Sequence, residues 1–140
     1  MLICSVGECM VELNSYNSKN YKLSFAGDTA NTAIYLSRLG AKVLYITSVG
    51  KDKLSERMVS FLKNEKLNIK YILRDPKRKI GLYIVENNQL GERNFFYWRL
   101  NSAARLYFQN VNINSFSKKL LNYNWIYFSG ITLSIYNDQN

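Results

Sequence analysis

Polar side chains gather at the start of a predicted helix in the segment 24–40, SFAGDTANTAIYLSRLG. A helix start exposes unpaired N–H groups and carries a partial positive charge, and Gly27, just before it, lets a ligand approach the backbone closely. There Asp28 can accept hydrogen bonds from the hydroxyls of a polyol, while Thr29 and Asn31 can both donate and accept. Asp28 and Asn31 lie three residues apart and share one helix face. The pattern fits a site for a hydroxylated ligand; the alternative is that Asp28 or Thr29 merely caps the helix.

A second group of candidate residues lies in the segment 91–99, GERNFFYWR. Successive side chains of a β-strand point to opposite faces, so Tyr97 and Arg99 share one face and Phe96 and Trp98 the other. A guanidinium can hold a carboxylate bidentately, and a phenol can reach a hydroxyl, so the first face suits an oxygen-rich anion. The alternative is a strand whose aromatic side chains pack against a partner sheet and whose arginine is solvated.

Tyr83 lies in the middle of a third segment of interest, IGLYIVE at 80–86. If this strand pairs with the strand that carries Tyr97, Tyr83 closes over the same ligand. The chain contains neither G-x-x-x-x-G-K-[ST] nor G-x-G-x-x-G, so it shows no nucleotide-phosphate loop of its own.

The composition is that of one globular domain and excludes several kinds of site. The chain has 140 residues, of which 47% are hydrophobic and 21% charged, which is enough for one sizeable core. It has no histidine, which excludes catalysis by a Ser-His or Cys-His pair and argues against a zinc site. Cys4 and Cys9 are expected to be buried and reduced.

The net charge of +9 does not by itself indicate a nucleic-acid partner. The basic residues are scattered, and the only dense run, RDPKRK at 74–79, surrounds the sole proline, so nucleic-acid binding is not expected. No apolar run approaches the roughly 18 residues that cross a bilayer. The N-terminus has no basic residue before its apolar stretch, unlike a signal peptide. We therefore expect a cytoplasmic protein with no membrane partner.

Strands and helices are expected to alternate, with β-rich segments inserted between them. The predicted strands are residues 2–7, 41–50 and 125–131, and the predicted helices are residues 28–39, 53–67 and 114–124, the last capped by Asn114 or Ser115. This order favours a parallel sheet with right-handed crossovers. Three short segments at 70–74, 80–87 and 92–100, with a hairpin turn at 87–91, predict a small antiparallel flap. Residues 14–22 are polar and turn-rich.

Six motifs, taken together, resemble the 2-keto-3-deoxygluconate kinases of the ribokinase-like (PfkB) sugar kinases. In chain order they are VGECMVEL (6–13), AGDTANTAIYLSRLG (26–40), TSVGKD (47–52), GLYIVE (81–86), GERNFFYWR (91–99) and YFSGITLSI (127–135). The match runs along essentially the whole chain. The GDTxNTA and FYWR motifs point to this subfamily rather than to ribokinases or fructokinases at large.

The resemblance implies an α/β fold: a ribokinase-like three-layer α/β/α core with an inserted β-flap lid. The core is expected at about 1–68 and 101–140, and the lid strands at about 14–24 and 69–100. The resemblance also implies that the helix start lines the sugar site and that the flap contacts the sugar acid, with an arginine near its carboxylate. The residues concerned are Gly27, Asp28, Thr29, Ala30 and Asn31 at the helix start, and Tyr83, Tyr97 and Arg99 in the flap.

The chain departs from the family's pattern at two motifs and in length. The family usually has Gly-Gly-Asp where this chain has Ala26 before Gly27 and Asp28, and a glycine shortly after VGKD, where this chain has Lys53-Leu54-Ser55. Members of the family are much longer. Their C-terminal half carries the ATP site, a glycine-rich anion hole and the aspartate base.

The resemblance therefore implies an ATP- and Mg²⁺-dependent sugar-acid kinase, of which this chain is the N-terminal half and supplies the sugar-binding part. The chain alone is expected to be inactive, because the 140 residues supply neither the nucleotide site nor a recognisable base. Asp28 is not expected to be that base, since the resemblance gives its counterpart a binding role. The alternatives are a non-catalytic sugar-binding or degraded kinase fragment, and another PfkB kinase such as a fructokinase or ribokinase. A homo-oligomer formed through the lid is a further expectation.

Overall fold

Nine strands and four α-helices make up the computed structural model over the residues that it describes, 1–17, 19–87 and 92–136. The strands are β1 (Leu2–Val6), β2 (Met10–Asn17), β3 (Asn20–Ala26), β4 (Lys42–Ile46), β5 (Ser48–Val49), β6 (Leu73–Arg74), β7 (Leu82–Asn87), β8 (Arg93–Trp98) and β9 (Trp125–Tyr127). The helices are α1 (Asp28–Arg38), α2 (Lys53–Asn64), α3 (Ile113–Leu120) and α4 (Gly130–Tyr136), with short 3-10 helices at Ala103–Leu106 and Phe108–Asn110.

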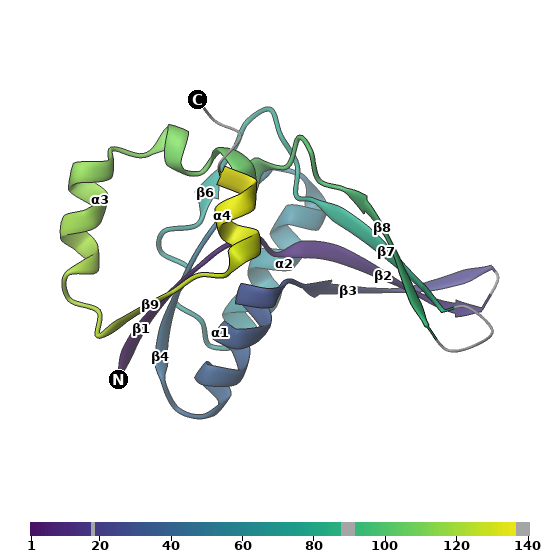
Figure 1. The fold of residues 1–140 in the computed structure, drawn as a ribbon, viewed down its shortest axis with the longest axis horizontal. Coiled ribbons are helices and arrows are strands. Elements are labelled where there is room, and N and C mark those ends of the chain that lie inside the picture. Colours follow the sequence, from purple (N-terminus) through teal and green to yellow (C-terminus); the bar gives the residue numbers. More distant parts are fainter. Residues whose placement is uncertain (18, 88–91, 137–140) are drawn as a thin grey trace.

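A parallel sheet in the order β4-β1-β9 forms the centre of the molecule. Successive side chains of β1 point to opposite faces of this sheet. Ile3 belongs to a buried cluster with Ala33 of α1 and Met58 of α2, whereas Cys4 belongs to a cluster with Phe116 of α3. Helices therefore cover both faces, which confirms the predicted three-layer α/β/α core (Figure 1).

A second sheet, which we call the lid sheet, projects from this core (Figure 1). Its order is β3-β2-β7-β8, with antiparallel hairpins β2–β3 and β7–β8 and a parallel pairing of β2 with β7. The predicted antiparallel flap is present and is enlarged by the β2–β3 hairpin. In that region the local pattern at residues 14–22 indicated only a turn-rich segment, whereas the family resemblance implied lid strands at about 14–24. These polar residues form strands because β2 has backbone partners on both sides. The predicted turn at 87–91 lies, from residue 88 on, outside the described residues.

The prediction that residues 70–74 belong to the flap was wrong. The strand β6 pairs instead in parallel with β5, so that Leu73 lies opposite Ser48. The predicted strand at 41–50 accordingly divides into β4, which belongs to the central sheet, and β5, which pairs with β6. Local β-propensity identified a strand here, of which only Leu73 and Arg74 are in β6, but not its partner, because the partner is chosen by tertiary packing.

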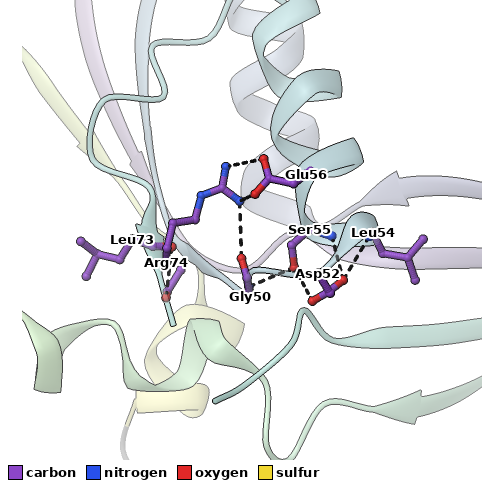
Figure 2. A network of polar contacts seen from close by, with 8 residues as sticks. Gly50, Asp52, Leu54, Ser55, Glu56, Leu73 and Arg74 are labelled. Carbon is purple, nitrogen blue, oxygen red and sulfur yellow. Dashed lines mark hydrogen bonds and ion pairs between the residues drawn. The ribbon is translucent and has the colours of Figure 1, made fainter. Parts of the chain in front are cut away.

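The start of α2 is held by the polar network in Figure 2. Asp52 is the N-cap residue, and its carboxylate accepts hydrogen bonds from the Ser55 backbone N–H at 3.1 Å and from the Ser55 hydroxyl at 2.9 Å. The same hydroxyl accepts a bond from the Gly50 N–H at 3.0 Å. Arg74 of β6 donates to the Gly50 carbonyl at 3.4 Å and forms an ion pair with Glu56 at 2.6 Å. The network therefore ties β6 to the start of α2.

The helix α3 begins earlier than predicted from the sequence. Its N-cap residue is Asn112, whose side chain accepts a hydrogen bond from the Ser115 N–H at 3.0 Å. Neither Asn114 nor Ser115 has the capping role that was predicted. Both lie inside the first turn, since Asn112 offers the same kind of side-chain oxygen earlier in the chain.

The predicted strand at 125–131 was wrong in its second half. The strand β9 ends at Tyr127, and α4 begins at Gly130. The Ser129 hydroxyl accepts a hydrogen bond from the Thr132 N–H at 3.1 Å, which satisfies a free donor of the first turn. An apolar run therefore changes from strand to helix at a capping serine.

One buried ion pair joins the lid sheet to the core. Glu8 lies between β1 and β2, Arg99 directly follows β8, and Arg99 Nη2 is 2.5 Å from Glu8 Oε2. The two side chains are 2% and 18% exposed, respectively. Gly81 makes room for them, since a Cβ at that position would lie 2.9 Å from Glu8 Oε1. The pair is therefore enclosed where the two sheets meet.

Replacing Glu8 by alanine is expected to lower the free energy of unfolding by about 3 kcal/mol, because it leaves the Arg99 charge buried without its partner. The measurement is chemical denaturation of the 140-residue chain. The matched control is Glu56→Ala, which breaks the ion pair of an exposed glutamate with Arg74 and should cost much less. Equal losses of unfolding free energy in the two variants would contradict the claim that the buried pair stabilises the fold more than the exposed pair does.

Candidate functional site

A cavity of about 240 Å³ opens at the carboxyl end of β1, between the start of α1 and the lid sheet. It is smaller than the pockets of roughly 300–1,000 Å³ that hold drug-sized ligands, and it suits a small metabolite. Its lining residues are Glu8, Met10, Gly27, Asp28, Asn31, Tyr83, Phe95, Tyr97, Arg99 and Ile131. Six of the eight residues singled out in the sequence are among them.

The floor of the cavity is the start of α1. Gly27 is the N-cap residue and makes no side-chain cap, so neither Asp28 nor Thr29 is the helix cap that the alternative interpretation required. Asp28 Oδ1 does accept a hydrogen bond from the Thr29 N–H at 2.7 Å. A Cβ at Gly27 would lie 2.2 Å from the backbone oxygen of Glu8. Only glycine allows the β1–β2 connection to approach the helix start this closely.

Thr29 and Ala30, which were also expected at the sugar site, are fully buried and do not line the cavity. The Thr29 hydroxyl lies 3.2 Å from the Tyr45 hydroxyl, and the Thr29 carbonyl accepts a hydrogen bond from Ser5 at 3.1 Å. These contacts fasten the first turn of α1 to β1 and β4. The two residues therefore position the floor, while Asp28 and Asn31 face the cavity.

The wall of the cavity consists of aromatic rings from β7 and β8. The ring centroid of Tyr83 lies 5.6 Å from that of Tyr97 and 6.3 Å from that of Phe95, within the range of favourable aromatic pairs. The Tyr83 hydroxyl donates a hydrogen bond to the Glu12 carboxylate. Burial and this bond raise the pKa of Tyr83, so the phenol stays protonated and acts as a donor. Tyr83 therefore lines the cavity while its hydroxyl is bonded to Glu12.

Arg99 brings a positive charge to the cavity in a fixed position. The guanidinium pairs with Glu8 and lies 5.9 Å from the ring centroid of Tyr97. The alternative interpretation of a solvated arginine is therefore wrong. Among the described residues, the buried Arg99 Nε has no hydrogen-bond partner. The guanidinium is oriented but not saturated, as an anion-binding group must be.

Glu8 adds a buried acid that the sequence interpretation missed. Burial raises the pKa of Glu8, and the favourable charges of Arg99 and Arg105 offset this only in part. A signal was present in the sequence, because an acid directly after a buried strand and a glycine lies at the carboxyl end of the sheet, where open α/β folds bind ligands. Ile131 was missed because its segment was predicted as a strand.

A larger hollow of about 600 Å³ lies elsewhere on the molecule, with Leu2, Lys42 and Tyr123 among its lining residues. Leu2 and Lys42 are the first residues of β1 and β4, so this hollow lies at the amino ends of the parallel strands. Ligands of open α/β sheets bind at the carboxyl ends. The smaller cavity is therefore the better candidate site.

Other kinds of site find little support in the part of the chain that the structure describes. Cys4 and Cys9 are buried and free, and burial raises the pKa of Cys4 to about 12. Within residues 1–17, 19–87 and 92–136, no group of three or more His, Cys, Asp or Glu side chains could hold a metal ion. No helix in these ranges has the length and apolar character needed to cross a membrane.

Comparison with known proteins shows relatives of one kind along nearly the whole chain. The 2-dehydro-3-deoxygluconokinase of Dickeya dadantii is 37% identical over 139 residues, which cover 96% of this chain and 44% of that protein. The 2-dehydro-3-deoxygluconokinase of Escherichia coli K12 is 35% identical over 137 residues, which cover 95% of this chain and 44% of that protein. The chain thus spans less than half the length of these curated relatives and matches their N-terminal part.

Solved structures show the same fold. The 2-dehydro-3-deoxygluconokinase of Thermotoga maritima superimposes with a TM-score of 0.82 at 23% identity, over 94% of this chain and 42% of that one. A fructokinase of Xylella fastidiosa with bound ATP gives a TM-score of 0.73 at 24% identity, over 83% of this chain and 36% of that one. At these identities the likeness concerns the fold, and it confirms the predicted ribokinase-like architecture.

The profile of the pfkB family carbohydrate kinases matches residues 1–138. The order of the motifs, the α/β/α core with its lid sheet and the sequence identities agree with this match. The chain belongs to the pfkB family of carbohydrate kinases.

Proposed function

We propose that this chain binds a sugar acid of the 2-dehydro-3-deoxygluconate type (also called 2-keto-3-deoxygluconate), as the sugar-binding part of an ATP-dependent kinase. The observation that carries the proposal is the cavity itself, which brings Asp28 and Asn31 of the helix start together with Tyr97 and Arg99 of the lid. These four side chains offer hydrogen-bonding groups for hydroxyls and a guanidinium for a carboxylate. The names of the two relatives described above agree with this ligand.

Five of the lining residues have distinct roles in this proposal. Arg99 binds the carboxylate of the sugar acid, and Tyr97 beside it reaches a hydroxyl. Asp28 accepts hydrogen bonds from the sugar hydroxyls, and Asn31 both donates and accepts. Gly27 lets the sugar lie close to the helix start, whose partial positive charge favours an anion.

ATP and Mg²⁺ belong to the proposal at the level of the whole kinase. ATP supplies the phosphoryl group, and Mg²⁺ neutralises the charge that develops on it. The described residues offer no acidic cluster for the metal, and the sequence has no phosphate loop. We therefore assign no residue of this chain to ATP, to Mg²⁺ or to the base. Its proposed part in catalysis is to position the sugar acid.

Arg99 is expected to contribute strongly to the affinity for the sugar acid. Replacing it by lysine keeps the positive charge beside Glu8 but removes the planar fork, so we expect binding of 2-dehydro-3-deoxygluconate to weaken about tenfold or more. Isothermal titration calorimetry on the 140-residue chain measures the change. Fructose, which lacks a carboxylate, is the matched ligand, and its affinity should be low and unaffected. A lysine variant with wild-type affinity for the acid would rule out the assigned role.

Asp28 is expected to bind the hydroxyls of the sugar rather than to hold the helix. Its replacement by alanine should weaken binding of the same sugar acid by about 1.5–3 kcal/mol, the range for hydrogen bonds to charged groups. Tyr35→Ala is the control, because Tyr35 lies on the same helix, is 63% exposed and does not line the cavity. Calorimetry should separate the two variants; similar affinities would refute the assignment.

The proposal also includes the expected self-association through the lid and a cytoplasmic location. Phe96 and Trp98 alternate with the cavity-lining residues of β8 and are 48% and 59% exposed. Replacing both by serine should shift the chain toward the monomer in sedimentation velocity experiments, because it removes apolar surface available to a second copy. An unchanged sedimentation profile would place any self-association elsewhere.

A further inference from the structure

One carboxylate, that of Glu12, connects three strands of the lid sheet beside the cavity. Glu12 lies in β2, opposite Ser24 of β3 on one side and Tyr83 of β7 on the other. Its carboxylate accepts hydrogen bonds from the Ser24 hydroxyl at 2.8 Å, from the Asn14 amide at 2.6 Å and from the Tyr83 hydroxyl. Glu12 itself is not among the residues that line the cavity. Any effect it has on a ligand therefore passes through Tyr83.

The protonation states of Glu12 and Tyr83 determine which of the two residues donates this hydrogen bond. Burial by itself raises the pKa of Glu12, but the hydrogen bonds from Tyr83, Ser24 and Asn14 outweigh it, and the pKa lies below its ordinary value. Glu12 is therefore an ionised acceptor and Tyr83 a protonated donor at neutral pH. Because a depressed pKa favours the ionised form, the bond is retained at neutral pH and weakens only as the pH falls through the pKa of folded Glu12.

The bond fixes more than one ring of the cavity wall. The first torsion angle of a tyrosine sets the direction in which its ring points, and a hydrogen bond at the far end of the ring keeps the Tyr83 side chain in one such direction. Tyr83 packs on Tyr97 with 5.6 Å between centroids, and Tyr97 in turn lies 5.9 Å from the Arg99 guanidinium. Successive contacts thus connect Glu12 through Tyr83 and Tyr97 to Arg99, the group proposed to bind the carboxylate.

We propose that Glu12 is a positioning residue for the sugar site: it holds the hydroxyl of Tyr83, so that Tyr83 meets the ligand with its ring and keeps the aromatic wall in place. This inference rests on the proposed function. Its physical basis is preorganisation, since a wall that is already ordered loses less entropy when the ligand binds.

The test is a double-mutant cycle on the affinity of the 140-residue chain for 2-dehydro-3-deoxygluconate. We expect Glu12→Ala and Tyr83→Phe each to weaken binding about fivefold to tenfold, the effect of one hydrogen bond. The double variant should be no weaker than either single variant, because both remove the same bond. Glu12→Gln should retain near wild-type affinity, since its amide oxygen can still accept from the tyrosine.

The matched control is Tyr21→Phe. Tyr21 donates a hydrogen bond of 2.9 Å to Glu86 on the exposed part of the same sheet, and removing it should leave the affinity unchanged. The proposal is overturned if the losses of Glu12→Ala and Tyr83→Phe add up. It is also overturned if Tyr83→Phe weakens binding far more than Glu12→Ala does, because the hydroxyl would then contact the ligand directly.

A second measurement separates this inference from the proposed function. In the ligand-free chain, the NMR shifts of the Phe95 and Tyr97 ring protons report where the Tyr83 ring lies. Glu12→Ala should change these shifts and Glu12→Gln should not. If the wild-type chain fails to bind the sugar acid, the proposed function fails, while the ring shifts still decide whether Glu12 holds Tyr83. Unchanged shifts in Glu12→Ala overturn the positioning role.

Discussion

The ion pair between Glu8 and Arg99 connects the two parts of the molecule whose meeting forms the cavity. Glu8 belongs to the connection that leaves the core sheet, and Arg99 directly follows the last strand of the lid sheet. A buried charge is tolerated only when it is paired, so each residue requires the other in place. Gly27 and Gly81 allow the approach, because a side chain at either position would meet Glu8 within 3 Å. The lid therefore lies over the start of α1 for an electrostatic reason.

The floor and the wall of the cavity are positioned by separate sets of contacts. The floor is fastened by Thr29 to Ser5 and Tyr45 of the core, and the wall by Glu12 to Tyr83. Polar side chains that do not line the cavity thus determine the positions of those that do. This arrangement suits a binding site, whose lining groups must be oriented before the ligand arrives and still retain free hydrogen-bonding capacity.

Much of this arrangement could be predicted from the sequence, because its patterns are local. The apolar periodicity that ends at Gly40 identified α1, and the alternation of β8 correctly placed Tyr97 and Arg99 on one face. The failures have tertiary causes. β6 chose β5 as its partner, and Ser129 turned an apolar run into α4. Thr29 was expected at the site because its hydroxyl suits a sugar, but Tyr45 of the core engages that hydroxyl instead. The role of Glu8 depends on Arg99, more than ninety positions away, which no local pattern shows.

The central claim is that one small anion is bound by the helix start and the lid at the same time. A crystal structure of this chain with 2-dehydro-3-deoxygluconate tests it most directly. We predict the carboxylate of the sugar acid at Arg99, its hydroxyls at Asp28 and Asn31, and the ring of Tyr83 against its carbon chain. A ligand found in the larger hollow at the amino ends of β1 and β4, or one that touches the helix start without Arg99, would contradict the account.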